Sequence, residues 1–185
     1  MTGARTRRPA PPDDPSSEKL AYQKALARLA RREMSGAEVR QGLARDGFTP
    51  PAIDAALARL ADLKFVDDPR LGARFARSRL AERGLGQHRV RRALQQKGVS
   101  RGIIEESLHA ALQDVSEADV VDRLARRFWR QKERLEPERR VQALWAFLLR
   151  RGFPAGLVGR RLRVLWPRWS DALAGLEPAA PEPED

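Results

Sequence analysis

A pattern of five apolar residues around one glycine occurs three times along this chain, at a period of about fifty residues. The first copy consists of Val39, Leu43, Gly47, Phe48, Ile53 and Leu57. The second copy consists of Val90, Leu94, Gly98, Val99, Ile104 and Leu108, and the third of Leu144, Leu148, Gly152, Phe153, Val158 and Leu162. A period of this length is typical of helical arrays, in which neighbouring units share a core that one unit could not bury alone.

Each copy of the pattern predicts two helices separated by a glycine turn, because its apolar residues recur every three or four positions. A further amphipathic helix precedes each copy, over about 18–32, 68–83 and 117–134. Ser35 followed by Glu38 is typical of a capping box. Thr49 before Pro50 and Asp68 before Pro69 each predict an N-cap with proline in the first helical position. The sequence therefore predicts an all-α fold of three tandem three-helix repeats.

The composition divides the chain into five segments. Residues 1–17 are rich in proline without apolar periodicity, and residues 175–185 are rich in proline and acidic residues, so both are expected to be disordered tails. The three repeats are expected over 18–64, 65–114 and 115–174, and positive charge increases from the first repeat to the third.

The net charge of +11 predicts a polyanionic partner or an acidic protein groove. Cysteine is absent, which excludes disulfides, thiolate zinc sites and cysteine nucleophiles and fits a reducing compartment. The sequence has no apolar run of membrane-spanning length and no apolar stretch typical of a signal peptide near residue 1. We therefore expect a cytoplasmic protein, monomeric and without contact to a membrane.

No group of residues supports an enzyme. Asp67 and Asp68 are adjacent, whereas two-carboxylate catalysis needs carboxylates that face each other across a cleft, so a capping role is favoured. His88 and His109 lack acidic or cysteine neighbours at metal-ligand spacing. The turn Gly84-Leu85-Gly86 joins two predicted helices. A dinucleotide-binding loop follows a strand, so this interpretation of the turn is excluded. We expect no catalytic residue, no metal and no cofactor.

Arginine supplies almost all of the excess positive charge and is the main candidate for partner binding. In the helix over 68–83, Leu71 and Phe75 mark the packed side, and Arg79 is expected on that side too. Arg70, Arg74 and Arg77 lie on the opposite face. The candidate partner-binding residues, for a protein groove or DNA phosphates, are Arg70, Arg74, Arg77, Arg89, Arg91, Arg92, Arg123, Arg126, Arg130, Arg150, Arg151, Arg160 and Arg161.

The alternative interpretation is a solvated basic face whose charges are balanced locally. Asp119 and Asp122 precede Arg123 and Arg126 by four residues, a spacing that favours ion pairs on a helix. Arg74 has no acidic residue three or four positions away, and the group Arg89, Arg91 and Arg92 is largely unopposed in sequence. Partner binding is therefore favoured for the second repeat, and both interpretations stay open for the helix over 117–134.

All four tryptophans lie in the third repeat, close to its arginines: Trp129, Trp145, Trp166 and Trp169. Arginine together with aromatic rings can form a stacking platform for single-stranded bases, with Trp166 and Trp169 as the candidates. The favoured alternative is that the tryptophans fill the core of a terminal repeat. Pro167 between the two candidates also predicts the end of the last helix.

The central stretch resembles the signature of the RecX family of regulatory proteins. The residues that carry the resemblance are Phe65-Val66-Asp67-Asp68, Arg70, Phe75, Arg79, Gly84, Gly86, Arg89-Val90, Leu94 and Lys97-Gly98-Val99. Arg31-Arg32 before Ser35 and the stretch Leu148-Leu149-Arg150-Arg151-Gly152-Phe153 fit the same family, so that the resemblance covers about 18–166. The proline-rich tails and Trp166-Pro167-Arg168-Trp169 depart from its pattern.

The resemblance implies an elongated array of three helical repeats that acts on the RecA recombinase and is not an enzyme. Family members bind in the groove of the RecA filament on single-stranded DNA and restrain its ATPase, strand-exchange and coprotease activities. By this resemblance the chain would regulate recombination, DNA repair and the SOS response. Two alternatives remain: a general basic helical DNA-binding protein, for which no dedicated base-reading helix is evident, and a scaffold for another acidic protein.

Overall fold

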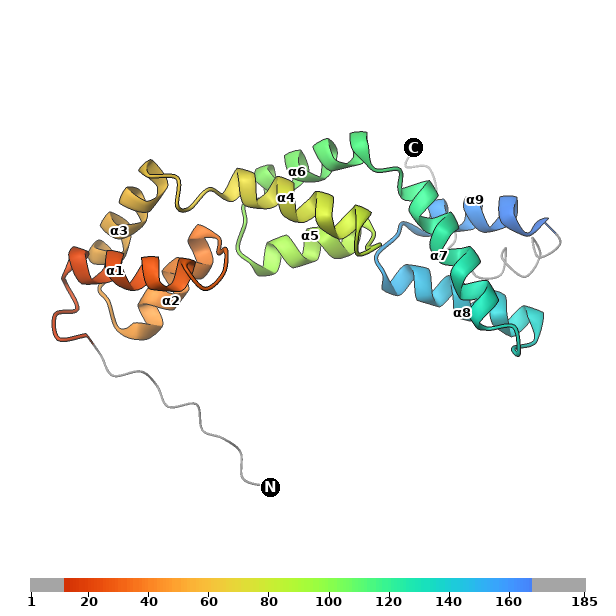
Figure 1. Cartoon of the computed structure of the whole chain (residues 1–185), viewed down its shortest axis with the longest axis horizontal. Coiled ribbons are helices and arrows are strands. Elements are labelled where there is room, and N and C mark those ends of the chain that lie inside the picture. Colours follow the sequence, from red (N-terminus) through yellow and green to blue (C-terminus); the bar gives the residue numbers. More distant parts are fainter. Residues whose placement is uncertain (1–11, 168–185) are drawn as a thin grey trace, which may run out of the picture. The chain divides into compact units, whose positions relative to one another are not determined.

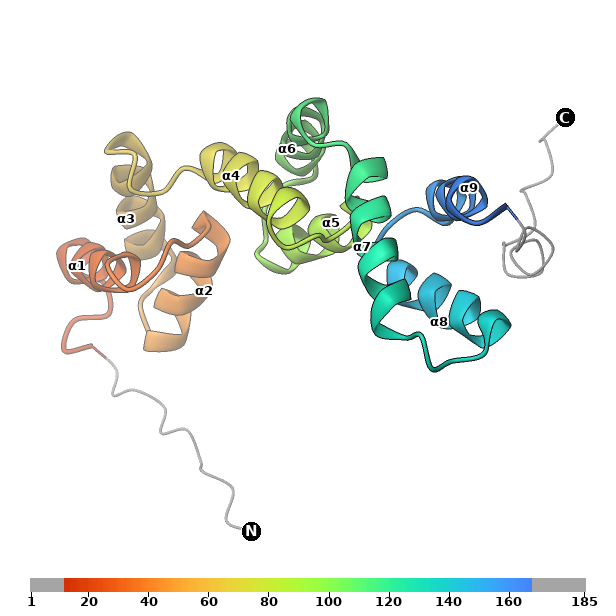
Figure 2. The ribbon, with the colours of Figure 1, turned by 45° about the vertical axis from the view of Figure 1, so that its right-hand side comes forward.

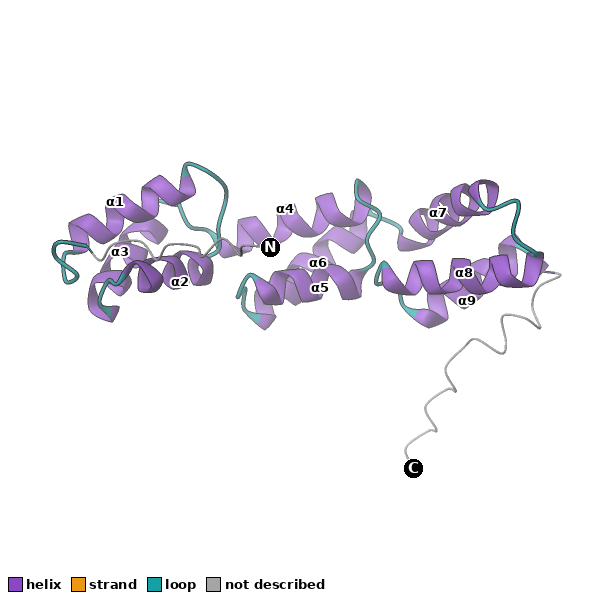
Figure 3. Cartoon of the chain, turned by 90° about the horizontal axis from the view of Figure 1, so that it is seen from below, coloured by secondary structure: helices purple, strands orange, loops and turns teal. Residues whose placement is uncertain are grey.

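The structure, a computed structural model, describes residues 12–167, and all regular elements in this range are helices (Figures 1 and 3). They follow one another as three groups of three. The bounds are Glu18–Leu29 (α1), Gly36–Asp46 (α2), Pro50–Asp62 (α3), Asp68–Ala81 (α4), Gln87–Gln96 (α5), Arg101–Asp114 (α6), Glu117–Gln131 (α7), Pro137–Arg150 (α8) and Ala155–Leu165 (α9). This order confirms the predicted all-α class and the three three-helix repeats.

Most of the two expected tails lies outside the described residues, which begin at 12 and end at 167. Residues 13–16 form a bend and turn before α1, and Ser17 caps that helix by accepting a hydrogen bond from the Leu20 amide. No helix within 12–167 is long and apolar enough to cross a membrane.

The described chain divides into two compact units, and the division runs through the middle repeat. Unit 1 contains residues 12–72 and 94–104, and unit 2 contains residues 73–93 and 105–167. The first repeat lies entirely in unit 1 and the third entirely in unit 2.

The core of unit 1 forms where α1, α2 and α3 pack on one another. Its fully buried members include Ala21 and Ala25 of α1, Leu43 of α2 and Leu60 of α3. Because alanine side chains are small, an alanine-rich α1 can pack closely on α3. Beside this core, the buried carboxylate of Asp46 accepts hydrogen bonds at 2.8 Å from Arg28 of α1.

The predicted capping box at the start of α2 is present. The Ser35 hydroxyl accepts a hydrogen bond from the Glu38 amide, and the Glu38 carboxylate accepts one from the Ser35 amide, both at 3.1 Å. Thr49 occupies the N-cap of α3 before Pro50 as predicted, although its side chain makes no capping hydrogen bond.

The prediction that Asp68 caps its own helix is wrong. Asp67 accepts the hydrogen bond from the Arg70 amide at 2.9 Å, which is the capping contact of α4. Asp68 already lies within the helix, and its carboxylate accepts a hydrogen bond from the Gly36 amide at the start of α2, also at 2.9 Å. Each carboxylate therefore satisfies a different helix N-terminus.

The core of unit 2 lies among α7, α8 and α9 (Figure 2). Val121, Leu144, Leu148 and Phe153 are almost completely buried there, and both aliphatic and aromatic residues pack around them. The ring centroids of Phe128 and Phe147 are 5.0 Å apart. The third repeat thus adds large aromatic side chains around its aliphatic core.

The repeated glycine ends the second helix of every repeat in the left-handed conformation, as predicted for Gly98. The φ angles are 100° at Gly47, 72° at Gly98 and 89° at Gly152, a region that glycine occupies without the steric cost of a side chain. After each glycine, the amide of the next residue donates to a carbonyl in the last helical turn, at Leu43, Leu94 and Leu148. The periodic pattern in the sequence is therefore a periodic helix stop.

Candidate functional site

In unit 1, the N-terminus of α2 meets the glycine turn that ends α5. The Ser35 hydroxyl donates a hydrogen bond to the carbonyl of Lys97, and a Cβ atom on Gly98 would collide with that of Ala37. The Lys97 ammonium also lies 3.1 Å from the Glu38 carboxylate. A side-chain donor at a helix N-terminus thus meets a carbonyl at a helix C-terminus and satisfies that backbone group.

In unit 2, backbone amides at the N-terminus of α5 donate to the glycine turn that ends α8. The Gly86 amide donates to the Arg151 carbonyl at 2.8 Å, and the His88 amide donates to the Gly152 carbonyl at 3.1 Å. Glu117, the first residue of α7, accepts a hydrogen bond from the Gln87 amide at 2.7 Å. Glu117 therefore has the role toward α5 that Asp68 has toward α2.

Beside this second junction lies a cavity of about 500 Å³, which we name the arginine cleft. Its lining consists of Arg79, Arg83, Leu85, Arg89, Phe147, Arg150 and Arg151. Five of the seven lining residues are arginines and none is acidic. Such a lining favours an anionic ligand, because guanidinium groups bind phosphate and carboxylate through paired hydrogen bonds.

Backbone carbonyls and an aromatic ring hold two arginines of the cleft, Arg89 and Arg151, in place. Arg151 donates to the carbonyls of Arg83 and Gly84 at 2.8 and 2.9 Å, and its guanidinium lies 5.0 Å from the centroid of the Phe147 ring. Arg89 donates to the carbonyl of Arg150 at 3.1 Å. These contacts orient positive charge without neutralising it, so the cleft keeps its positive potential.

Three predicted partner-binding residues meet in the cleft: Arg89, Arg150 and Arg151. Arg79 and Arg83 were not predicted to belong to it. Arg79 was assigned to the packed side of its helix, and its guanidinium lies over the Phe75 ring at 4.8 Å from the centroid. The spacing of Arg79 and Arg83 could have indicated that both belong to one site, because it places both near the same end of α4.

Three other predicted arginines pair with carboxylates: Arg77, Arg91 and Arg161. Arg77 pairs with Asp114, and Arg91 binds Glu105 through two hydrogen bonds of 2.9 Å. The hydrogen bonds that Arg91 donates to Glu105 raise the pKa of Arg91 above its usual value. The expectation that Arg91 is unopposed is therefore wrong, because its partner lies fourteen residues away on α6.

The spacing favoured a pair of Asp122 with Arg126 under the alternative interpretation, but Arg161 of α9 donates to both oxygens of Asp122. The Nε atom of Arg161 lies 2.9 Å from one of them, and this hydrogen bonding raises the pKa of Arg161. Arg123 donates to the carbonyl of Ala81 at 3.2 Å.

The remaining predicted arginines are exposed and lie outside the lining of the cleft. Arg70 belongs to unit 1, and the others belong to unit 2: Arg74, Arg92, Arg126, Arg130 and Arg160. A role for them in partner binding remains a prediction.

The tryptophans of the described region pack within the third repeat. Trp145 is buried, and Trp166 stacks on Trp129 with ring centroids 4.5 Å apart. Arg140 lies over the Trp129 ring at 4.3 Å from its centroid. These contacts favour the interpretation that the tryptophans complete the core. Base stacking by Trp166 stays a hypothesis, and Trp169 lies outside the described residues.

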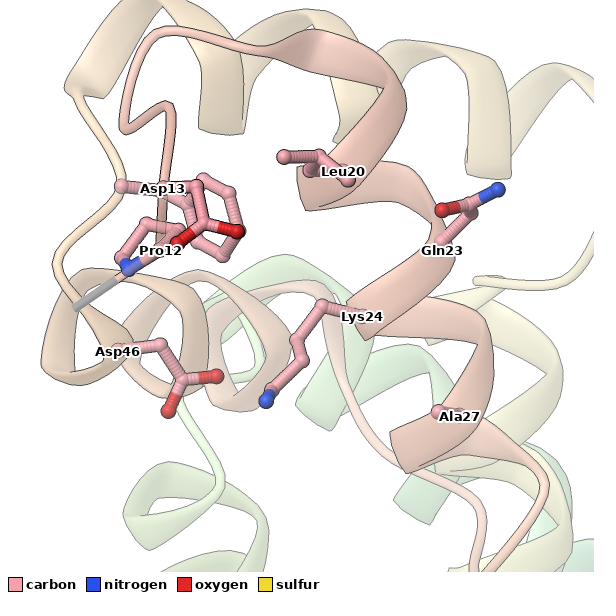
Figure 4. Close-up of a pocket in the computed structure, with 8 residues that line it drawn as sticks. Pro12, Asp13, Leu20, Gln23, Lys24, Ala27 and Asp46 are labelled. Carbon is pink, nitrogen blue, oxygen red and sulfur yellow. The ribbon is translucent and has the colours of Figure 1, made fainter. Parts of the chain in front are cut away.

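A second hollow, in unit 1, has a different character (Figure 4). It measures about 350 Å³ and lies between α1, the segment at Pro12–Asp13 and the end of α2. Lys24 and Asp46 both project into it, so its lining carries both signs of charge. It lacks the single-sign lining of the arginine cleft and is a weaker candidate for a polyanion.

The described residues contain no group of three or more histidine, aspartate and glutamate side chains that could hold a metal ion. Asp67 and Asp68 are both used as helix caps, as described above. The chemistry that the described residues support best is the binding of anions in the arginine cleft.

Comparison with known protein families gives three consecutive matches. They are the first, second and third three-helix domains of RecX, over residues 21–60, 67–108 and 116–160. The matches correspond to the three groups of helices and together cover more than half of the chain.

Named relatives and solved structures agree with these matches. The chain is 31% identical over 163 residues to a regulatory protein RecX of Deinococcus radiodurans, covering 88% of this chain and 72% of that protein. It is 40% identical over 137 residues to a regulatory protein RecX of Halorhodospira halophila, covering 72% and 81%. The crystal structure of RecX from Lactobacillus salivarius has a similar fold, with a TM-score of 0.72 at 18% identity over 80% of this chain and 96% of that one.

Proposed function

Because this chain belongs to the RecX family of regulatory proteins, which implies a regulatory role toward the RecA recombinase, we propose that it binds in the groove of the RecA filament on single-stranded DNA. The bound chain mainly inhibits RecA. It acts in the cytoplasm and as a monomer. Its action requires binding alone and no catalytic residue.

The arginine cleft is the observation that carries this proposal. Its five arginines face an anionic partner, and a filament groove offers both DNA phosphates and acidic side chains of RecA. The carbonyl contacts of Arg89 and Arg151 fix two of these arginines before binding, so little conformational freedom is lost on contact.

Binding in the groove would restrain RecA in two ways. A bound chain that contacts neighbouring protomers resists the rearrangement that accompanies ATP hydrolysis, and a filled groove excludes a second DNA and the substrates of the coprotease. Recombination, DNA repair and the SOS response would all be dampened as a result.

The test is ATP hydrolysis by the cognate RecA on single-stranded DNA at near-physiological salt, with this chain titrated below one molecule per protomer. We expect inhibition at substoichiometric ratios that survives the addition of free competitor DNA. Loss of inhibition on adding that DNA would instead support the alternative, a general DNA-binding protein that needs no recombinase. No inhibition at any ratio would contradict the proposal.

A further inference from the structure

Helix α7 presents a row of exposed arginines on its outer face. The row consists of Arg123, Arg126, Arg127 and Arg130, and we name these residues the α7 arginine row. Their spacing along a helix of about 3.6 residues per turn places them within about one third of its circumference. The other side of α7 packs into the core of the third repeat. At about 1.5 Å per residue, the row is roughly 10 Å long.

The carboxylates nearest to this row in sequence do not neutralise it. Asp122 precedes Arg126 by four residues, but both of its oxygens accept hydrogen bonds from Arg161 of α9. Asp119 is exposed at the start of the same face, and no ion pair within residues 12–167 joins it to the row. The row therefore keeps its positive charge, which favours partner binding over the locally balanced face that the sequence left open.

The α7 arginine row adjoins the arginine cleft within unit 2. Arg123 donates a hydrogen bond to the carbonyl of Ala81 at 3.2 Å. Ala81 is the last residue of α4 and lies between Arg79 and Arg83, which both line the cleft. Positive charge thus extends from the cleft onto the outer face of α7.

The chemistry of the row fits the backbone of a nucleic acid better than a protein surface. A stable protein interface buries an apolar centre, and none of the exposed large hydrophobic side chains of the described region lies on α7. A phosphate backbone is a continuous series of negative charges and requires only cations opposite it.

Contact with bases is not favoured at this face. The row contains no asparagine or glutamine that would read a base edge. Trp129, the tryptophan of α7, already stacks on Trp166 and lies against Arg140. The outer face of α7 therefore offers charge without a means of reading sequence.

We propose that the α7 arginine row binds the phosphate backbone of DNA, independently of base sequence and of RecA. The inference goes beyond the proposed function, because it adds a site that requires no recombinase. Binding through such a site is weak at physiological salt, with a Kd of about 10⁻⁴ to 10⁻⁶ M. It raises the local concentration of the chain along DNA, where RecA filaments form. Each exposed arginine contributes little alone, so the effect is measured by removing three together.

The experiment measures the affinity of the full chain for a single-stranded oligothymidylate by fluorescence anisotropy over a series of salt concentrations. Each phosphate contact on a single strand contributes about −0.7 to the slope of log affinity against log salt. The variant R126Q/R127Q/R130Q is expected to lower the steepness of this slope by about two and to weaken binding roughly tenfold at low salt.

The matched control is R31Q/R45Q/R101Q, which removes the same charge from exposed positions of unit 1. Its slope should change by about half a unit or less. The variant R126K/R127K/R130K should keep the wild-type slope, because ion release depends on the number of charges and lysine retains them. An equal loss of slope in the two glutamine variants would show that net charge alone binds DNA, and would overturn the inference.

The measurement contains no RecA, so its outcome is distinguishable from failure of the proposed function. Wild-type DNA binding by R126Q/R127Q/R130Q would overturn the inference even if the variant inhibited RecA normally. Wild-type DNA binding together with lost RecA inhibition would assign the row to an acidic protein surface, and would overturn it as well.

Discussion

At the scale of single residues, the positions without a side chain determine how closely the helices join. Gly86 donates its amide to the Arg151 carbonyl, and a Cβ atom on Gly86 would collide with the backbone of Gly152 and Phe153. From the sequence, Gly86 was interpreted only as part of a turn. Its close approach to α8 could not be predicted, because the contact joins residues that are 65 positions apart.

Gly86→Ala is therefore expected to lower the free energy of unfolding by about 1–3 kcal/mol, the usual cost of an added methyl group in a tightly packed site. Gly102→Ala is the matched control, because a Cβ atom at Gly102 in α6 meets no atom within 4 Å. We expect it to be neutral or to stabilise by up to about 1 kcal/mol. Urea denaturation followed by circular dichroism measures both, and equal effects would contradict the proposed role of Gly86.

At the scale of helices, each junction is closed by an acidic residue with its own electrostatic environment. Burial, opposed by the hydrogen bonds from Gln87, raises the pKa of Glu117 above its usual value. Burial also acts to raise the pKa of Glu38, but hydrogen bonds from the Ser35 amide and Lys97, with the charges of Lys97 and Arg32, bring it below its usual value. The two junctions should therefore respond to pH in opposite directions.

The contribution of Glu117 to stability is fully present below the pKa of about 4.5 that the group has when unfolded, and is lost as pH rises through the higher folded pKa. The contribution of Glu38 is present above its unfolded pKa and is lost as pH falls through the lower folded value. Urea unfolding of the wild type, Glu117→Gln and Glu38→Gln between about pH 3 and 7 measures both. Stability relative to wild type should change with opposite slopes in the two variants; slopes of equal sign would contradict the assigned environments.

The sequence predicts the helices well, their caps in part, since the cap at Asp68 was wrong, and long-range pairs poorly. The period of Gly47, Gly98 and Gly152 and the capping box at Ser35 are visible because they depend on neighbours within one or two helical turns. The pair Arg91–Glu105 and the cap that Glu117 gives to α5 join different helices, so no spacing rule indicates them. For the same reason the arginine cleft was predicted only in part, since Arg83 and Arg150 come from different repeats.

At the scale of the whole molecule, the described residues form three consecutive three-helix repeats, and five arginines line one cleft in unit 2. The repeats belong to the fold that the RecX family shares, and the cleft lies where the second repeat meets the third within unit 2. The proposal that the chain acts on a filament through one site rests on this cleft, because net charge alone predicts only general attraction to DNA. A net charge of +11 alone would serve either function.

The measurement that tests this account most directly is inhibition of RecA ATP hydrolysis on single-stranded DNA by two variants of equal net charge. R83Q/R150Q removes two guanidinium groups from the cleft, and R92Q/R126Q removes two exposed ones outside it. We predict that the concentration for half-inhibition rises on the order of tenfold or more in the first variant, as expected for two lost charge-assisted hydrogen bonds. In the second variant it should rise about twofold or less. Equal loss in both variants would contradict a specific role for the arginine cleft.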